Sequence, residues 1–516
     1  MGGISRNCVI AAVSNFSTAY NLVVINIVHV LLEHQYCATS CKAHVERAST
    51  SSLVGAIIGQ LVFGYVGDCI GRARALQLTM HLCVFGALLS ACAVPIFPSR
   101  PQSIFTFLAV ARLILGVGVG GVYPLSATIT VESASAASRG RDTSLVFSMQ
   151  GVANLAVPLV AAALVHAYGS PARASAGRSW GYAWRLALGL GALPGILIWP
   201  FELAGRRGAR TRRQRRAGIE MQTIADGADD RDASPGARRS GSTKLARDGG
   251  RRAGKYRRLE TDGGSADGWA ALRDRRYWGK LVGTAGGWFL FDVTFYGNIL
   301  FQPTVLREVF SVKLNAIPSL TGPLPRNVAL QMAILAAIGL PGYYVAVCLM
   351  DRLGRRTIQL QGFVAMGLLY AGMGIFGSRL QRAPMAMLAI YGLTFFFSNF
   401  GPNSTTFILP AETFPAHVRT TLNGFSAAMG KLGATVGAAL FVPLTAATSV
   451  QTVLLACAGV SWLGALVTWV FVEDRRGKRV NHAGRAVTPD PNGGALEQNA
   501  DDDRDRDERL GVPPAA

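Results

Sequence analysis

Long apolar stretches alternate with short polar ones along most of this chain. Twelve such stretches lie near residues 7–32, 50–66, 75–97, 104–129, 144–167, 183–202, 281–309, 327–350, 358–376, 385–409, 422–446 and 450–472. About 20 apolar residues in a helix are enough to cross the hydrocarbon core of a bilayer. The pattern therefore predicts an all-α polytopic membrane protein with twelve transmembrane helices, six on each side of a long polar insert.

The polar segments divide the chain into four predicted regions. Residues 1–202 form a first six-helix half and residues 281–472 a second. The insert, 203–280, holds 21 Lys/Arg against 10 Asp/Glu, and the tail, 473–516, is similarly polar. Both lack apolar periodicity, so we expect them to be disordered. An even number of spans puts both termini on one side, which the arginine-rich insert marks as cytoplasmic.

The composition argues against the soluble classes of protein. The chain has 516 residues, of which 16% are charged, whereas soluble domains carry about 25%. A formal net charge of +21 would suggest nucleic acid in a soluble protein, but these arginines lie in loops and tails, which favours a lipid bilayer as the partner and no nucleic acid. No catalytic motif or metal-ligand cluster occurs, so we expect no enzyme, no cofactor and no metal. Cys37 and Cys41 are close enough for a local disulfide, which the pattern does not favour.

Two charged signatures recur along the chain at a nearly constant offset. Asp68 and Arg72, which follow the second span, recur as Asp351 and Arg355 after the eighth, an offset of 283 residues. Each pair belongs to an Asp-x-x-Gly-Arg turn at a membrane boundary. Such pairs are candidate gating contacts, because ion pairs between helices can lock one transport state and release in another.

The second signature is a Glu seven residues before an Arg. Glu132 and Arg139 follow the fourth span, and Glu412 and Arg419 follow the tenth, an offset of 280 residues. Two signatures in register favour duplication of a six-helix unit and add these four residues to the candidate gating contacts. Ordinary charged turns between helices are the alternative.

Five further segments lie on the fourth, fifth, seventh, tenth and eleventh spans. They are residues 120–128 (GGVYPLSAT), 148–151 (SMQG), 288–296 (WFLFDVTFY), 399–407 (NFGPNSTTF), and 410–415 (PAETFP) followed by 426–431 (SAAMGK). In content and order they resemble the phosphate:proton symporters of the major facilitator superfamily, the inorganic phosphate transporters of fungi and plants. The resemblance implies twelve helices in two halves, alternating access, inorganic phosphate and protons as the transported species, and the plasma membrane as the location.

The resemblance also implies a set of substrate-binding residues: Tyr123, Gln150, Trp288, Asp292, Tyr296 and Asn403. Trp288, Asp292 and Tyr296 share one helix face at spacings of i, i+4 and i+8. An aspartate at mid-depth costs about 2.5–3.5 kcal/mol on insertion scales, so Asp292 should face a wet cavity. In the family this aspartate also carries the coupled proton. The alternative is a structural acid paired with Arg112 or Lys431.

Arg112 and Lys431 are the two basic residues expected on the charge pathway. Arg112 lies ten residues before position 122, as in the family. Lys431 matches a family lysine near the cytoplasmic end of the pathway. The alternative for Lys431 is a side chain that extends to the membrane interface.

The chain departs from the family at three acidic positions. Thr18 and Asn21 stand where the first span of the family has two aspartates, and Val122 stands where the fourth has another. These changes shift the site from acidic toward basic and put proton coupling in doubt, although Asp292 still allows one-proton symport. The alternatives are uniport or exchange of phosphate, transport of another organic anion or a sugar, and a sensor that binds phosphate without transport. The sequence does not specify the oligomeric state.

Overall fold

The computed structural model describes residues 5–37, 42–97, 99–168, 178–200, 268–296, 299, 324–380, 382–473, 479–480 and 486–487. Helices dominate: α1 (Arg6–Tyr36), α2 (Lys42–Ile70), α3 (Arg72–Ala91), η1 (Pro101–Ser103), α4 (Ile104–Ser133), α5 (Arg139–Tyr168), α7 (Arg178–Gly189), η2 (Leu190–Ala192), η3 (Ala270–Arg273), α10 (Arg275–Leu281), η4 (Val282–Gly286), α12 (Leu324–Leu353), α13 (Arg355–Leu380), α14 (Pro384–Asn399), α15 (Pro402–Thr413), α16 (Arg419–Ala447) and α17 (Val450–Phe471).

Eleven helical stretches within the described ranges are long and apolar enough to cross a membrane. They correspond to every predicted span except the seventh, 281–309. That span is helical through residue 296, and most of its remainder lies outside the described residues. The protein is therefore an integral, multi-pass, all-α membrane protein, as the hydrophobic pattern predicts.

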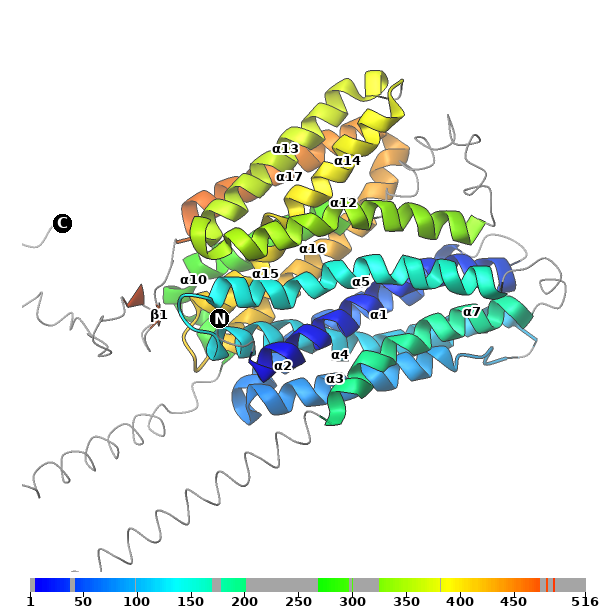
Figure 1. Ribbon diagram of the computed structural model, residues 1–516, viewed down its shortest axis with the longest axis horizontal. Helices are drawn as coiled ribbons and strands as arrows, with labels where there is room; N and C mark the ends of the chain where they lie inside the picture. The colour runs from blue at the N-terminus through cyan, green and yellow to red at the C-terminus, as the bar shows by residue number, and fades with distance from the viewer. Residues whose placement is uncertain are drawn as a thin grey trace, which may run out of the picture.

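The helices form two bundles that lie side by side. In Figure 1 the helices from α1 to α7, coloured blue to teal, make one bundle, and those from α12 to α17 make the other. Small residues let the bundles approach closely. A Cβ on Gly151 of α5 would lie 2.6 Å from the Tyr343 ring of α12, and one on Gly424 of α16 would overlap the main-chain oxygen of Gln60 in α2.

The duplicated Asp-x-x-Gly-Arg motif forms the same turn in both halves. Gly71 joins α2 to α3 with φ 95°, and Gly354 joins α12 to α13 with φ 87°. Both values lie in the left-handed region, which glycine adopts without the steric cost that a Cβ brings. The glycine of the motif is therefore explained by the sharp reversal between two membrane helices.

The predicted boundary at residue 280 falls inside a helix, α10. The end of the predicted insert, from residue 268, packs on one end of the bundles. The Trp269 ring stacks on Tyr65 of α2 with centroids 6.2 Å apart, and the Tyr277 ring meets Phe414 edge-on at 6.1 Å. These aromatic contacts pack the segment against both halves, while the division of the chain at residue 280 stays a prediction.

Most of the predicted insert and tail lies outside the described residues. In the tail, β1 (Arg479–Val480) pairs antiparallel with β2 (Ala486–Val487). The expected disorder of 203–280 and 473–516 otherwise stays a prediction.

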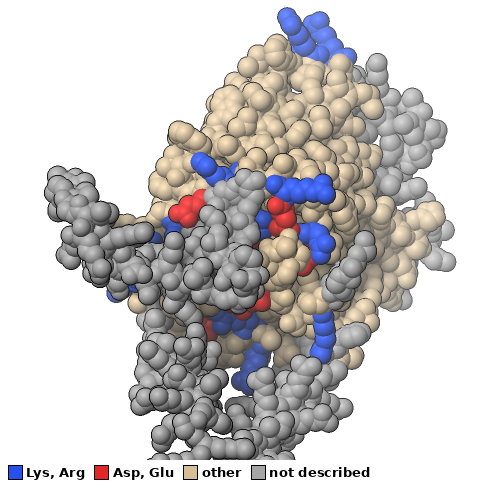
Figure 2. Space-filling view, turned by 60° about the vertical axis from the view of Figure 1, so that its left-hand side comes forward, with Lys and Arg blue, Asp and Glu red and all other residues tan. Residues whose placement is uncertain are grey.

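Charged side chains gather at one end of the molecule. Figure 2 shows Lys, Arg, Asp and Glu clustered on the end that carries the N-terminus and α10 in Figure 1. Of the helices that begin with an arginine, α3, α5, α13 and α16 begin with the arginines of the repeated signatures: Arg72, Arg139, Arg355 and Arg419. Basic residues concentrated at one membrane boundary are typical of the cytoplasmic side.

Candidate functional site

Lys431 of α16 lies at the centre of a buried polar cluster. Its Nζ is 3.4 Å from Asp292 Oδ2 and donates a hydrogen bond of 2.8 Å to Tyr296 Oη. The same ammonium lies 5.4 Å from the ring centroid of Tyr123 in the other half. Lys431 and Asp292 are only 4% and 2% exposed, so this pair occupies a low-dielectric environment in which Coulomb attraction is strong.

The helix at residues 287–296 explains why Asp292 and Tyr296 both reach Lys431. A spacing of four residues puts them one above the other on one helix face, as the sequence predicts. Trp288, one turn earlier, is also buried. It packs on Gly430 of α16, where a Cβ would lie 2.5 Å from the indole Cδ1. The glycine beside Lys431 therefore lets the indole approach α16 closely.

The N-terminal half supplies Tyr123 and Gln150. Tyr123 Oη in α4 donates to Gln150 Oε1 in α5, at 3.4 Å. Tyr123 thus lies between the amide of its own half and the ammonium of the other half. The cluster therefore spans the boundary between the two bundles.

Asn403 lies in the first turn of α15, immediately after the break between α14 and α15. Its Nδ2 donates to Tyr343 Oη of α12 at 2.9 Å and to Asn399 Oδ1 at 2.7 Å. Tyr343 packs on Phe147 of α5, with ring centroids 5.9 Å apart. Tyr343 is not among the residues expected from the sequence, because one tyrosine in an apolar run carries no periodic signal of a site.

An aromatic contact links Asn403 and its neighbours to Tyr123. The Phe407 ring, one turn after Asn403, stacks on Phe147 at 4.5 Å and meets the Tyr123 ring edge-on at 6.3 Å. The six residues expected to bind substrate thus all lie on helices whose side chains meet in this buried cluster. Its formal charges are those of Lys431 and Asp292, and the other members are neutral.

Arg112 lies apart from this cluster. It precedes Tyr123 by eleven residues in α4, which corresponds to about 16 Å along a helix. Its Nη2 donates to the main-chain oxygen of Asn21 in α1. Two partners were considered for Asp292, Arg112 and Lys431, and in the structure Asp292 pairs with Lys431. Lys431 is twelve residues, or about 18 Å, inside α16, and its position along the transport pathway stays a prediction.

The predicted gating residues lie at the ends of α2, α4, α12 and α15 and at the starts of α3, α5, α13 and α16. Asp68 accepts a hydrogen bond of 2.8 Å from the main-chain N–H of Thr421 in the other half and pairs with Arg72 at 3.1 Å. In the repeat, Asp351 accepts one of 2.8 Å from the main-chain N–H of Arg141 and pairs with Arg355 at 3.1 Å. Both aspartates therefore join the two halves.

The two glutamates of the second signature behave differently from each other. Glu412 forms a buried, bidentate pair with Arg355 of its own half, at 2.7 and 2.8 Å. Glu132 instead pairs across the halves with Arg419, at 3.0 Å, and lies 3.5 Å from Arg72. Arg139 begins α5, where Asp351 accepts from the next two main-chain N–H groups.

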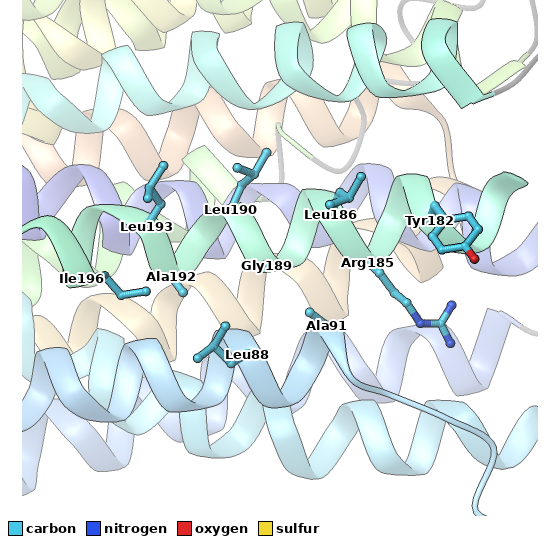
Figure 3. A pocket seen from close by; sticks show the side chains of 10 residues that line it. All are labelled: Leu88, Ala91, Tyr182, Arg185, Leu186, Gly189, Leu190, Ala192, Leu193 and Ile196. Atoms are coloured by element: carbon cyan, nitrogen blue, oxygen red, sulfur yellow. The ribbon is translucent and has the colours of Figure 1, made fainter.

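A groove of about 400 Å³ lies elsewhere, on the outer surface of the N-terminal half. Figure 3 shows it between α3 and α7, with Leu88 and Ala91 on one side and Ile196 and Ala192 on the other. Its lining is almost wholly apolar, and Arg185 and Tyr182 stand at one end. The groove shares no residue with the polar cluster and is not the candidate site.

Plant relatives of this chain are named as inorganic phosphate transporters. The chain is 34% identical over 464 residues to "Inorganic phosphate transporter 1-6" of Oryza sativa subsp. japonica, with 84% of this chain and 82% of that protein covered. It is 33% identical over 500 residues to "Low affinity inorganic phosphate transporter 4" of Petunia hybrida, covering 90% and 89%. These relatives are transporters and not enzymes, in agreement with the absence of catalytic motifs from the sequence.

Solved structures share the fold at low sequence identity. The MFS (major facilitator superfamily) proton:xylose symporter XylE matches with a TM-score of 0.66 and 20% identity, over 92% of this chain and 97% of that chain. The E. coli fucose:proton symporter FucP matches with a TM-score of 0.57 and 12% identity, over 91% and 100%. The profile of the Major Facilitator Superfamily matches residues 8–438. By fold and by sequence, the chain belongs to the major facilitator superfamily.

Proposed function

We propose that this protein carries inorganic phosphate across a membrane by alternating access. The observation that carries the proposal is the buried ammonium of Lys431, which touches Asp292 and Tyr296 of its own half and faces Tyr123 of the other. A cation between two rocking halves can bind an anion from either side in turn. The names of the plant relatives identify phosphate as the anion.

Phosphate would bind by replacing Asp292 as the partner of Lys431. Tyr123, Gln150, Trp288 and Asn403 are neutral, and their hydroxyl, amide and indole groups can donate to the phosphate oxygens. A site with one cation and several neutral donors binds an anion without holding it too tightly to leave. These roles rest on the geometry and on the resemblance together.

Asp292 is the proposed proton carrier. It is the one carboxylate that the described helices bring to Lys431, since positions 18, 21 and 122 hold Thr18, Asn21 and Val122. When Asp292 takes a proton it no longer balances the charge on Lys431, which can then bind phosphate. Loss of that proton on the other side restores the ion pair and expels the anion. The mechanism predicts one coupled proton at this site.

The proposed location is the plasma membrane, with both termini cytoplasmic. Arginines at the start of α3, α5, α13 and α16 support a cytoplasmic placement of that end. Cys37, at the opposite end of α1, is disulfide-bonded, and disulfides persist outside the cytosol. The disulfide differs from the sequence expectation for Cys37, while Cys41 lies outside the described residues.

Three rival functions make different predictions. A uniporter or exchanger would move phosphate without a proton gradient, and a carrier of another organic anion or a sugar would move a different substrate. A sensor would bind phosphate without moving it. Only the symporter needs both flux and a protonatable Asp292.

The decisive experiment is uptake of labelled phosphate by the full chain in proteoliposomes, with and without an inward proton gradient and at a clamped membrane potential. We expect gradient-stimulated uptake in the wild type, and uptake without stimulation in Asp292→Asn. Sulfate, arsenate and xylose serve as competitors. Stimulation that survives in Asp292→Asn would overturn the proton role. Binding without uptake under every condition would overturn transport in favour of the sensor.

A further inference from the structure

Arg112 of α4 is fully buried and only partly hydrogen-bonded. Its Nη2 donates to the main-chain oxygen of Asn21, whereas Nε and Nη1 have no hydrogen-bond partner in the part of the chain that the structure describes. Arginine keeps its charge in proteins and carries five N–H donors. Buried donors that lack a partner cost free energy, so this guanidinium is incompletely stabilised by the described protein groups.

Arg112 also lacks a carboxylate partner among the described residues. The ion pairs found there involve other basic side chains. In α1 and α4 the only acids are Glu33 and Glu132, and each lies in the last turn of its helix. An uncompensated buried charge costs several kcal/mol. A negative charge from outside the chain would remove most of that cost.

Two polar side chains of α1, Thr18 and Asn21, are buried, and each has a polar atom that makes no hydrogen bond within the described residues. Thr18 Oγ1 and Asn21 Oδ1 have no hydrogen-bond partner among the described residues. Asn21 is held in place because its Nδ2 donates to the main-chain oxygens of Ser17 and Gly191, both at 2.9 Å. Thr18 lies one turn before Asn21, on the same side of the helix. The region is therefore polar, and besides the N–H groups of Arg112 it holds one unused donor, the Thr18 hydroxyl.

We propose that Arg112 binds one monovalent inorganic anion, represented here by chloride, inside the N-terminal half. One guanidinium balances one negative charge, and chloride needs only donors, which Arg112 Nε, Arg112 Nη1 and the Thr18 hydroxyl can supply. The doubly charged form of phosphate carries more charge than Arg112 alone can balance. The ion takes the place that an acidic side chain at position 18 or 21 would fill.

This anion site is distinct from the proposed phosphate site. Arg112 and Tyr123 are eleven residues apart in α4, about 16 Å along the helix axis. The site is static, because the groups that form it all belong to the N-terminal half, which moves as one body in alternating access. Its proposed effect is on the stability of that half, and it is independent of whether phosphate is the transported species.

The test is chloride binding by the purified full chain in a gluconate buffer of constant ionic strength. Labelled chloride in equilibrium dialysis should saturate at one ion per chain, and the Tm should rise with chloride and bromide as ligand linkage requires. Phosphate at saturating concentration should leave chloride affinity within twofold of its value without phosphate. Chloride that is displaced competitively by phosphate would place it at Lys431 and overturn the proposal.

Variants separate a bound ion from a general salt effect. Arg112→Gln should lose saturable binding. Thr18→Asp should also lose it, but should be more stable than the wild type when chloride is absent, because the new carboxylate balances the charge of Arg112. Asn21→Asp is the second acid variant, although it also loses the hydrogen bonds from Asn21 Nδ2 to Ser17 and Gly191. The matched control is Arg185→Gln in α7, since the Arg185 guanidinium already donates to the main-chain oxygens of Gly181 and Ala93.

Three results would contradict the anion site. They are no saturable chloride binding in the wild type, retained binding in both Arg112→Gln and the folded acid variant, and a Tm rise that gluconate produces equally. The last result would mean that water alone completes the hydrogen bonds of Arg112.

Discussion

Asp68, at the end of α2, accepts hydrogen bonds from the main-chain N–H and the hydroxyl of Thr421 in α16, at 2.8 and 2.7 Å. In the repeat, Asp351 accepts from the main-chain N–H groups of Gly140 and Arg141 in α5, at 2.9 and 2.8 Å. Each half thus uses one carboxylate to cap the first turn of a helix in the other half, where the helix dipole favours negative charge. The duplicated motif forms a reciprocal pair of caps that holds these ends of the two halves together.

Replacing Asp68 by asparagine should weaken the contact between the two halves at these helix ends. Hydrogen bonds to a charged group contribute about 1.5–3 kcal/mol, so we expect the fraction of molecules in which these helix ends are separated to rise about ten- to hundredfold. The measurement is maleimide labelling of Val131→Cys, since Val131 near the end of α4 is buried. The exposed thiols Cys69, Cys92 and Cys348 are first replaced by serine.

Asp142→Asn is the control for this labelling experiment. Asp142 pairs with its neighbour Arg141 at 2.9 Å and accepts from Ser138 at 2.9 Å, so both of these contacts stay within the N-terminal half. Loss of the Asp142 carboxylate should leave the labelling rate of Val131→Cys unchanged. An equal rate in Asp68→Asn and the wild type would mean that the caps do not stabilise the closed state.

The two glutamates of the repeated signature should differ in their effect on stability. The Glu412 pair with Arg355 is buried, with side chains 8% and 6% exposed, and breaking such a pair costs about 3–5 kcal/mol. Glu132 is 33% exposed, and a pair at that exposure contributes about 0–1 kcal/mol. In detergent unfolding we therefore expect a large loss of stability for Glu412→Gln and a small one for Glu132→Gln. Equal losses would refute this ranking.

Lys431→Gln should abolish high-affinity phosphate binding. The lost charge-assisted contact is worth about 1.5–3 kcal/mol, which corresponds to about a ten- to hundredfold weaker Kd. The single variant also leaves Asp292 buried without its ammonium partner, so it should be less stable. The double variant Asp292→Asn/Lys431→Gln should recover stability but not binding, as scintillation proximity with labelled phosphate can check. Recovered binding would exclude Lys431 as the phosphate ligand.

Gly430→Ala should disturb the site without an added charge. A Cβ there would lie 2.5 Å from the Trp288 indole, too close for carbon atoms, so the indole or α16 must shift beside Lys431. A displacement of about 1 Å in a binding site can cost about 100-fold in rate. We expect phosphate uptake to fall at least tenfold, while Gly459→Ala, where nothing lies within 4 Å of the new Cβ, retains full uptake. Normal uptake in Gly430→Ala would show that this contact tolerates movement.

The membrane fold could be predicted from the sequence because lipid imposes a simple rule. Each span must be apolar over its length, and turns such as Asp68 to Arg72 must be polar, so spans and repeats are visible in one dimension. The boundary at residue 280 could not be predicted in this way. The amphipathic segment around Tyr277 is too short and too polar to resemble a span, and its burial against Phe414 is a tertiary contact.

The sequence indicates which residues belong to the candidate site, but it says less about how they are arranged. Spacing alone puts Asp292 and Tyr296 on one face. It does not give the rotation of α16, which turns Lys431 toward them, or the position of Tyr343 beside Asn403. Spacing does separate Arg112 from Tyr123, but only the packing of α1 shows that Arg112 donates to the main-chain oxygen of Asn21.

The last prediction concerns Val122, which is fully buried directly before Tyr123 in α4. A carboxyl group at this position would take up and release a proton beside the proposed phosphate site, and it would add an acid to a cluster whose one carboxylate is now Asp292. Val122→Asp should therefore make phosphate uptake rise more steeply as the outside pH falls, with a larger stimulation by the proton gradient than in the wild type. Val122→Asn, of equal size but not titratable, is the matched control. An identical pH profile for the two variants would mean that the missing acid at this position does not limit proton coupling.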